Sequence, residues 1–151
     1  MIPRLHVVKD VITALAADQI IAAVGGSGLM AALDLTDQVH DWDLTTDAEP
    51  AAVQAALTSA HLAYSRADAG DGTFATRARF RIDGNDHDVD LIVGFAIHHD
   101  DGIVHLPTRI TGYWHDLPLG DPAVWAQAYN YMNRHHQAKC LENWLSRART
   151  H

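Results

Sequence analysis

Hydrophobic and polar positions recur with two different periods along the chain, and the changes of period divide it into elements. Apolar residues at helical spacing predict a first amphipathic helix over residues 8–18. The apolar run 20–24 ends at two glycines and is typical of a buried strand. A short helix is predicted over 27–35 with Ser27 as its N-cap. Residues 41–45 alternate between polar and apolar, which predicts a second strand.

The middle of the chain continues with period two and contains strong turn signals. A helix is expected to begin at Pro50, because proline is favoured in the first helical turn. Segment 70–95 predicts two antiparallel strands joined by the turn 83–86, whose sequence is Asp-Gly-Asn-Asp. A further turn at 100–102 predicts another short strand over 103–106.

The last part of the chain returns to helical spacing. A helix is predicted with Asp121 as its N-cap and Pro122 in its first turn, followed by a second amphipathic helix over about 138–147. This order of elements predicts an α/β (α+β) fold in which helices cover a mixed sheet and a helix pair ends the chain. Because no repeat or linker interrupts the sequence, we expect one domain over 1–151, with its core at about 20–95 and a helical tail at about 119–149.

The composition is that of an acidic globular protein, with 48% hydrophobic and 20% charged residues and a formal net charge of -8 at pH 7. A polynucleotide would be repelled by this charge, so a nucleic-acid partner is not expected. No apolar run reaches the roughly 20 residues that span a bilayer, and no secretory signal is evident. The single cysteine, Cys140, cannot form an intrachain disulfide. We therefore expect a cytoplasmic protein with no membrane partner.

Two pairs of aspartates are the main candidates for chemistry. Asp41 and Asp43 are two residues apart on a predicted strand, so their side chains share one face. Read alone, such a pair is more simply a solvated strand end, but carboxylates at this spacing repel each other, and oxygen ligands suit Mg²⁺. A third acid on a later strand would complete a metal site. Asp88 and Asp90 both qualify, and Asp90 is preferred because hydrophobic residues flank it.

A glycine-rich turn upstream is a candidate phosphate site. Gly25, Gly26 and Ser27 lie between a predicted strand and a predicted helix start, where backbone N–H groups favour an anion. Further along, Arg77 and Arg79 begin a stripe of arginines at period two. This stripe either meets a triphosphate or an acidic acceptor, or it forms a solvated face that balances the aspartates.

These residues resemble the signature of the DNA polymerase beta-like nucleotidyltransferases. Thirteen residues separate Gly26-Ser27 from Asp41-Trp42-Asp43-Leu44, and Val89-Asp90-Leu91 matches the lone third acid on a later strand. The resemblance covers about residues 20–95. It is closer to the small standalone members, including antibiotic-modifying and antitoxin-type proteins, than to the CCA-adding polymerases, because the chain is too short for their later domains.

The resemblance implies a role for each matched residue. Asp41 and Asp43 would bind two Mg²⁺ ions, while Asp90 would assist one metal and activate the acceptor hydroxyl. Ser27 and the two glycines before it would hold the phosphates of a nucleoside triphosphate, most simply ATP. Around the start of the last predicted helix, Arg134 and Lys139 stand where the family has an arginine and a lysine.

The resemblance thus implies transfer of a nucleoside monophosphate, AMP, to a hydroxyl of a small-molecule or protein acceptor. An alternative is a non-catalytic, antitoxin-like subunit of the same fold that works through protein interactions. A salt bridge from Arg77 or Arg79 into the aspartate triad would favour this alternative. The sequence shows no separate region for binding the acceptor. A homo-oligomer that forms the acceptor pocket between two chains is therefore a further alternative.

Overall fold

The computed structural model describes residues 2–67, 73–100 and 102–149. In chain order, the helices and strands of these residues are α1 (His6–Ala17), β1 (Ala23–Gly25), α2 (Gly26–Ala32), β2 (Trp42–Thr46), α3 (Pro50–Ser59), β3 (Ser65–Ala67), β4 (Ala78–Asp83), β5 (Asp88–Val93), β6 (Ala96–His99), β7 (Gly102–His105), β8 (Gly112–Trp114), β9 (Leu117–Leu119), α4 (Pro122–Tyr131) and α5 (His135–Arg149).

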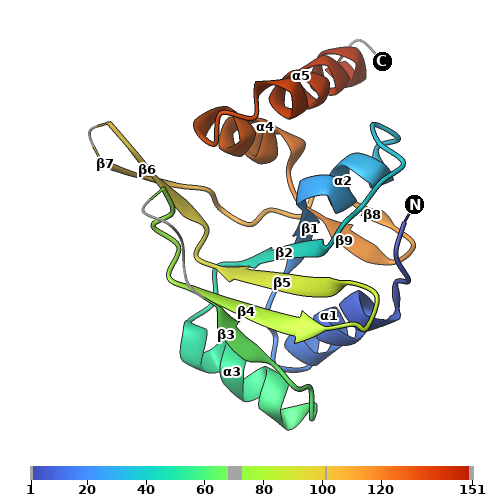
Figure 1. Cartoon of the computed structure of the whole chain (residues 1–151), viewed down its shortest axis with the longest axis vertical. Coiled ribbons are helices and arrows are strands. Elements are labelled where there is room, and N and C mark those ends of the chain that lie inside the picture. The colour runs from blue at the N-terminus through green and yellow to red at the C-terminus, as the bar shows by residue number, and fades with distance from the viewer. Residues whose placement is uncertain (1, 68–72, 101, 150–151) are drawn as a thin grey trace.

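A seven-stranded mixed sheet runs through the molecule in the order β3-β4-β5-β2-β1-β9-β8. Strands β2 and β5 are parallel neighbours, while β4 and β1 pair antiparallel with their outer edges. The β6–β7 hairpin forms a separate two-stranded sheet that extends from one side of the molecule (Figure 1). The strands that carry the predicted acids, β2 and β5, therefore lie next to each other at the centre of the main sheet.

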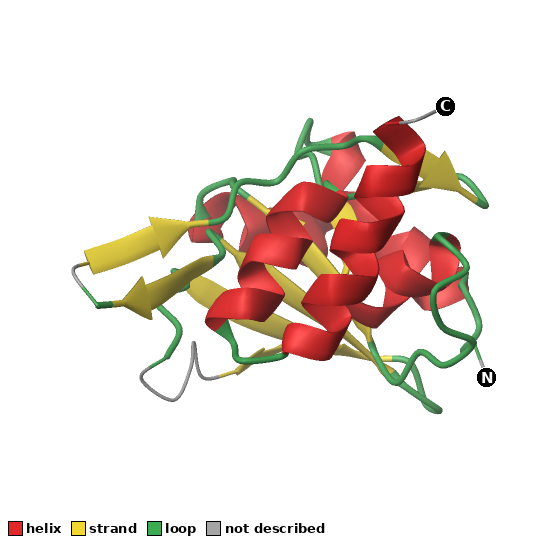
Figure 2. Cartoon of the chain, turned by 90° about the horizontal axis from the view of Figure 1, so that it is seen from above, coloured by secondary structure: helices red, strands yellow, loops and turns green. Residues whose placement is uncertain are grey.

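Helices cover the main sheet on both faces. Figure 1 shows α1 and α3 on one face and α2, α4 and α5 on the other. Seen from above, α4 and α5 lie side by side as a pair across the sheet (Figure 2). This arrangement confirms the predicted mixed sheet covered by helices, with a C-terminal helix pair.

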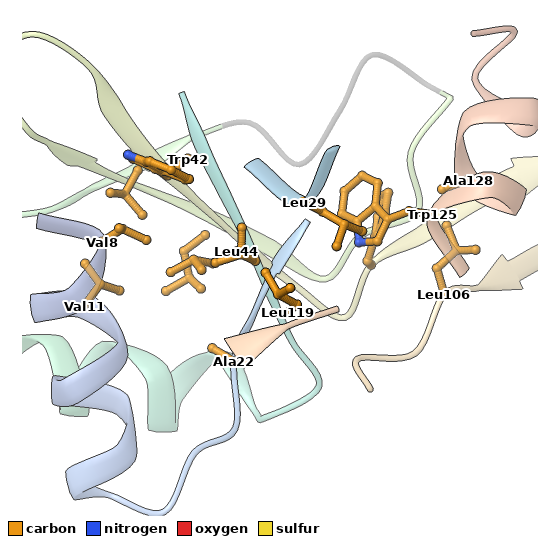
Figure 3. Close-up of a cluster of buried hydrophobic side chains, with 14 of the residues drawn as sticks. Val8, Val11, Ala22, Leu29, Trp42, Leu44, Leu106, Leu119, Trp125 and Ala128 are labelled. Atoms are coloured by element: carbon orange, nitrogen blue, oxygen red, sulfur yellow. The ribbon is translucent and has the colours of Figure 1, made fainter. Parts of the chain in front are cut away.

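Period-two geometry in β2 separates the core from the opposite face. Trp42 and Leu44 are completely buried and pack toward Val8 and Val11 of α1 (Figure 3). The indole Nε1 of Trp42 also donates a hydrogen bond to the backbone oxygen of Arg4 at 3.3 Å. Burying a side chain of this size stabilises the fold by about 3 kcal/mol and holds the odd-numbered residues of β2 on the other face.

Several local predictions differ from the structure. The strand predicted over 20–24 begins only at Ala23, and the N-cap of α2 is Gly25, whose extended backbone precedes the helix, so Ser27 lies inside it. Strands β3, β8 and β9 were not predicted, because three residues are too few to show alternation.

Two further local predictions concern caps and turns. The Asp121 cap of α4 is confirmed, since its side chain accepts a hydrogen bond from the Ala123 N–H at 2.9 Å. The turn predicted at 100–102 includes Asp101, which lies outside the described residues. None of the helices in the described part of the chain is both long enough and apolar enough to cross a membrane.

Candidate active site

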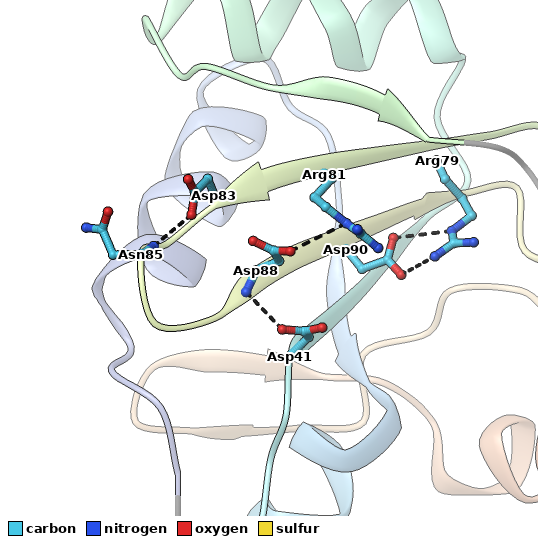
Figure 4. Close-up of polar contacts among 7 residues, drawn as sticks. All are labelled: Asp41, Arg79, Arg81, Asp83, Asn85, Asp88 and Asp90. Atoms are coloured by element: carbon cyan, nitrogen blue, oxygen red, sulfur yellow. Dashed lines mark hydrogen bonds and ion pairs between the residues drawn. The ribbon is translucent and has the colours of Figure 1, made fainter.

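The parallel pairing of β2 and β5 sets two acidic side chains beside each other. Asp43 is the register partner of Asp90, and both lie on the face that α4 and α5 cover. Asp41 precedes β2 by one residue, and its Oδ1 accepts a hydrogen bond from the Asp88 N–H at 2.9 Å (Figure 4). The sheet therefore brings three of the predicted acids to neighbouring positions.

Asp43 carries the electrostatic strain of this arrangement. Its pKa is raised to about 7, chiefly because burial penalises the charged form and further because Asp90 and Asp41 are nearby. Arg79 and Arg134 act in the opposite direction without cancelling the effect. A cation close to Asp43 would relieve both the desolvation and the repulsion between the carboxylates.

Asp90 is engaged by Arg79 of β4 in a two-pronged ion pair. The guanidinium donates from Nε to Oδ1 at 3.3 Å and from its terminal nitrogen to Oδ2 at 2.5 Å (Figure 4). The side chains are 25% and 14% exposed, so this pair is partly shielded from solvent. Asp88 instead pairs with Arg81 at 3.6 Å toward solvent, which leaves Asp90 as the acid of β5 that faces the site.

Arg77 does not join the carboxylates. Its guanidinium forms an exposed ion pair with Glu49, just before α3, at 2.7 Å, and its aliphatic stem packs over Gly94. The buried and exposed side chains alternate back through Arg77 to the buried Thr76, although β4 itself begins at Ala78. The predicted stripe is divided by its partners instead, since Arg77 pairs with Glu49 and Arg79 pairs with Asp90. Of the two arginines proposed for ligand binding, the structure places only Arg79 at the aspartates.

Two cavities meet at Asp43. The larger, of about 530 Å³, is polar, and the residues that matter here are Ser27, Asp41, Asp43, Tyr129, Arg134 and Gln137. The smaller, of about 290 Å³, is bordered by Asp43, Asp90, Arg79, Tyr129 and Arg134 together with a group of aromatic and apolar side chains. A ligand in one cavity can therefore reach a ligand in the other across Asp43.

The glycine turn serves packing at this junction. A Cβ on Gly25 would overlap the Trp125 indole, and a Cβ on Gly26, whose φ is +57°, would overlap the Asp43 carboxylate. The glycines thus admit an indole from α4 and a carboxylate from β2 close to the backbone. Ser27 lies in the following turn and borders the larger cavity, on the same side as Asp41.

Two aromatic residues of α4, Trp125 and Tyr129, also belong to the site. Tyr129 borders both cavities, and its pKa is raised because the phenol is buried and lies near Asp43. The Trp125 indole packs against Gly25 and lines the smaller cavity. Their helical spacing is the same as that of ordinary core residues, so only the tertiary fold distinguishes them. Arg134 borders both cavities as well, whereas the exposed Lys139 borders neither of them.

The donor set fits a divalent metal in its chemistry. Asp41, Asp43 and Asp90 supply carboxylate oxygens, which Mg²⁺ prefers, and the pKa of Asp43 is raised by burial and by the two neighbouring carboxylates. Among the described residues, however, no group of three or more His, Cys, Asp or Glu side chains is gathered closely enough to hold a metal ion. The contact with Arg79 holds Asp90 in another interaction, so metal binding requires this side chain to rearrange.

Comparisons with known proteins identify the fold. No protein-family model matches the sequence, and a comparison with curated proteins finds no match either. Among solved structures, the chain is similar to TM1012 from Thermotoga maritima, which is provisionally assigned as a nucleotidyltransferase. The TM-score is 0.66 at 19% identity, and the match covers 95% of this chain and 92% of that one.

The antibiotic-resistance factor ANT(2″)-Ia has a similar structure too. Its complex with adenylyl-2″-tobramycin gives a TM-score of 0.58 at 13% identity, covering 95% of this chain and 98% of that one. Its solution structure gives a TM-score of 0.56 at 13% identity, covering 97% and 91%. These matches span almost the whole of each chain, and at such identities they establish the architecture. The protein has the nucleotidyltransferase fold.

Proposed function

We propose that this protein is a Mg²⁺-dependent nucleotidyltransferase that moves AMP from ATP to a hydroxyl of a small-molecule or protein acceptor. The observation that carries this proposal is the placement of Asp43 and Asp90 side by side on parallel strands, where a polar and an apolar cavity meet. The fold that the chain shares with TM1012 and ANT(2″)-Ia supports the same reaction class.

Different residues of the two cavities would bind the metal and the triphosphate. Asp41 and Asp43 would hold the metal with help from Asp90, and the bound Mg²⁺ would neutralise charge on the phosphates. Ser27 borders the polar cavity, where its hydroxyl donor suits the triphosphate.

The reaction balances without any further reactant. The acceptor hydroxyl oxygen forms a bond to the α-phosphorus while the bond from that phosphorus to the bridging oxygen breaks. Pyrophosphate leaves with the electron pair of the broken bond. The hydroxyl proton passes to a carboxylate oxygen of Asp90 and then to solvent. Because Arg79 engages both Asp90 oxygens, it has to release one of them before Asp90 can accept this proton.

Isothermal titration calorimetry tests the proposal through ATP binding in the presence of Mg²⁺. The wild type should bind ATP only when Mg²⁺ is present, and Asp43→Asn should weaken binding about tenfold or more, because a charged metal ligand is lost. Asp10→Asn serves as the control, since Asp10 is an exposed residue of α1 on the opposite face of the sheet. The proposal fails when the wild type binds no nucleoside triphosphate with Mg²⁺.

The second candidate is a non-catalytic, antitoxin-like subunit, and the ion pair between Arg79 and Asp90 favours it. In such a subunit, Arg79 would replace the metal permanently as the positive charge of the site. Mg²⁺ titrations of the wild type and Arg79→Gln separate the two candidates. An enzyme should bind Mg²⁺ with ATP in the wild type, whereas a non-catalytic subunit should bind it only when Arg79→Gln frees the carboxylate.

A further inference from the structure

The smaller cavity has a distinctive lining for a site beside two acids. Four aromatic side chains, two of them from α4, form one continuous series. Phe74 stacks on Phe95 with ring centroids 6.4 Å apart, Phe95 lies 5.2 Å from Trp125, and Trp125 lies 5.8 Å from Tyr129. Ile92 and Met132 add aliphatic and thioether surface to this lining. Aromatic walls of this kind favour a flat apolar ligand, because ring faces stack and exclude water.

The charges around the smaller cavity select against a cationic ligand. Among the described residues that border it, the acids are Asp43 and Asp90, and the proposed function uses both for the metal. No further carboxylate remains there to pair with an ammonium group, so a polyamine would leave buried charges uncompensated.

The positive groups of this cavity favour an anion instead. The exposed Arg134 borders the cavity, and its guanidinium has no ion-pair partner in the described part of the chain. A guanidinium in this position can pair with a carboxylate or phosphate in two-pronged geometry. Tyr129 adds a phenol that borders both cavities and can donate to an acceptor oxygen.

We propose that the smaller cavity binds the acceptor, and that the acceptor is a small anionic hydroxy compound with a planar apolar ring. This proposal rests on the proposed function, which assigns the polar cavity to the triphosphate. The acceptor hydroxyl then approaches Asp90 and Asp43 from the aromatic side, opposite Ser27 and Asp41, as in-line displacement requires. The volume of about 290 Å³ is sufficient for one substituted ring.

Three probes that share one ring and one phenolic hydroxyl test the ligand class. They are 4-hydroxyphenylacetate, 4-ethylphenol and tyramine, which are anionic, neutral and cationic, and tobramycin is added as a polyamine. Each is titrated by ligand-observed NMR into the wild type with Mg²⁺ and a non-hydrolysable ATP analogue. We expect 4-hydroxyphenylacetate to bind about fivefold more tightly than tyramine, with tobramycin weakest. Equal or tighter binding of tyramine or tobramycin overturns the proposal.

A charge-changing variant locates the probe. Met132→Glu places an acid in the cavity and should reverse the preference toward tyramine, because the partly exposed side chain at the end of α4 borders the cavity. Ile103→Glu, on the exposed β7 strand, borders neither cavity and should leave the preference unchanged. An unchanged preference in Met132→Glu overturns the assignment of the probe to this cavity.

Nucleotide binding separates a failure of this proposal from a failure of the proposed function. When the ATP analogue binds but no aromatic probe does, the acceptor class is wrong and the proposed function stands. Competition between 4-hydroxyphenylacetate and the ATP analogue would show that the cavity holds the adenine base, which also overturns the acceptor assignment. When the probes bind but no nucleotide does, the ligand class of the cavity stands and the proposed function is overturned.

Discussion

Replacing Asp43 with asparagine should stabilise the metal-free protein at neutral and alkaline pH, although the same change removes a proposed metal ligand. In the folded protein the pKa of Asp43 is raised from its ordinary value of 3.8 to about 7, first by burial and then by Asp90 and Asp41. The folded wild type therefore binds the Asp43 proton more tightly than the unfolded chain does. Its stability relative to the variant is highest below pH 4, falls as the pH rises toward 7 and then stays constant.

The size of this effect follows from the two pKa values. Their difference corresponds to about 4 kcal/mol of unfolding free energy once the pH is above both of them. Asp43 is only partly buried and borders two solvent-accessible cavities, so water and salt screen part of the repulsion. We therefore expect Asp43→Asn to raise the unfolding free energy at pH 8 by about 2 kcal/mol.

Urea unfolding followed by tryptophan fluorescence measures this difference. The wild type, Asp43→Asn and the control Asp10→Asn are compared at pH 3.5 and pH 8 in the presence of a chelator. The Asp43 variant should gain stability at pH 8 and show almost no gain at pH 3.5, and the control should follow the wild type. Equal or lower stability of Asp43→Asn at pH 8 would refute the electrostatic reasoning.

Three further changes test the packing that positions the site. Gly26→Ala should lower the unfolding free energy by at least about 1 kcal/mol in chemical denaturation, because φ is +57° and the new Cβ meets Asp43; a neutral result would contradict the close approach. Trp42→Ala should cost about 3 to 5 kcal/mol in the same assay, and a loss under 1 kcal/mol would show that the indole is not the anchor of β2. Asp121→Ala should cost about 1 kcal/mol by removing the cap of α4, whereas Asp121→Asn should retain most of the stability.

The sequence was sufficient to predict the central strands and the fold class. The alternation in 41–45 places Trp42 in the core and Asp43 on the other face, and β2 has this arrangement. The turn signal at 83–86 predicts the β4–β5 hairpin, where the Asp83 side chain accepts a hydrogen bond from the Asn85 N–H at 2.8 Å (Figure 4). Such features are local, so a few neighbouring residues determine them.

Features that depend on long-range pairing could not be predicted in the same way. The register that sets Asp43 beside Asp90 joins residues 47 positions apart, and no local pattern specifies it. The same is true of the contact between Trp125 and Gly25, which places an aromatic wall at the glycine turn. The sequence also cannot show which arginine pairs with Asp90. Arg79 forms this ion pair, whereas Arg77, two residues earlier, pairs with Glu49.

A crystal structure with Mn²⁺ and a non-hydrolysable ATP analogue tests most directly that Asp41, Asp43 and Asp90 form a metal-dependent transfer site. Anomalous density should lie among these three carboxylates, with the triphosphate extending toward Ser27 and the Arg79 side chain moved away from at least one Asp90 oxygen. An unchanged Arg79–Asp90 ion pair, with neither metal nor nucleotide density at Asp43, would contradict the enzymatic function and favour the non-catalytic subunit.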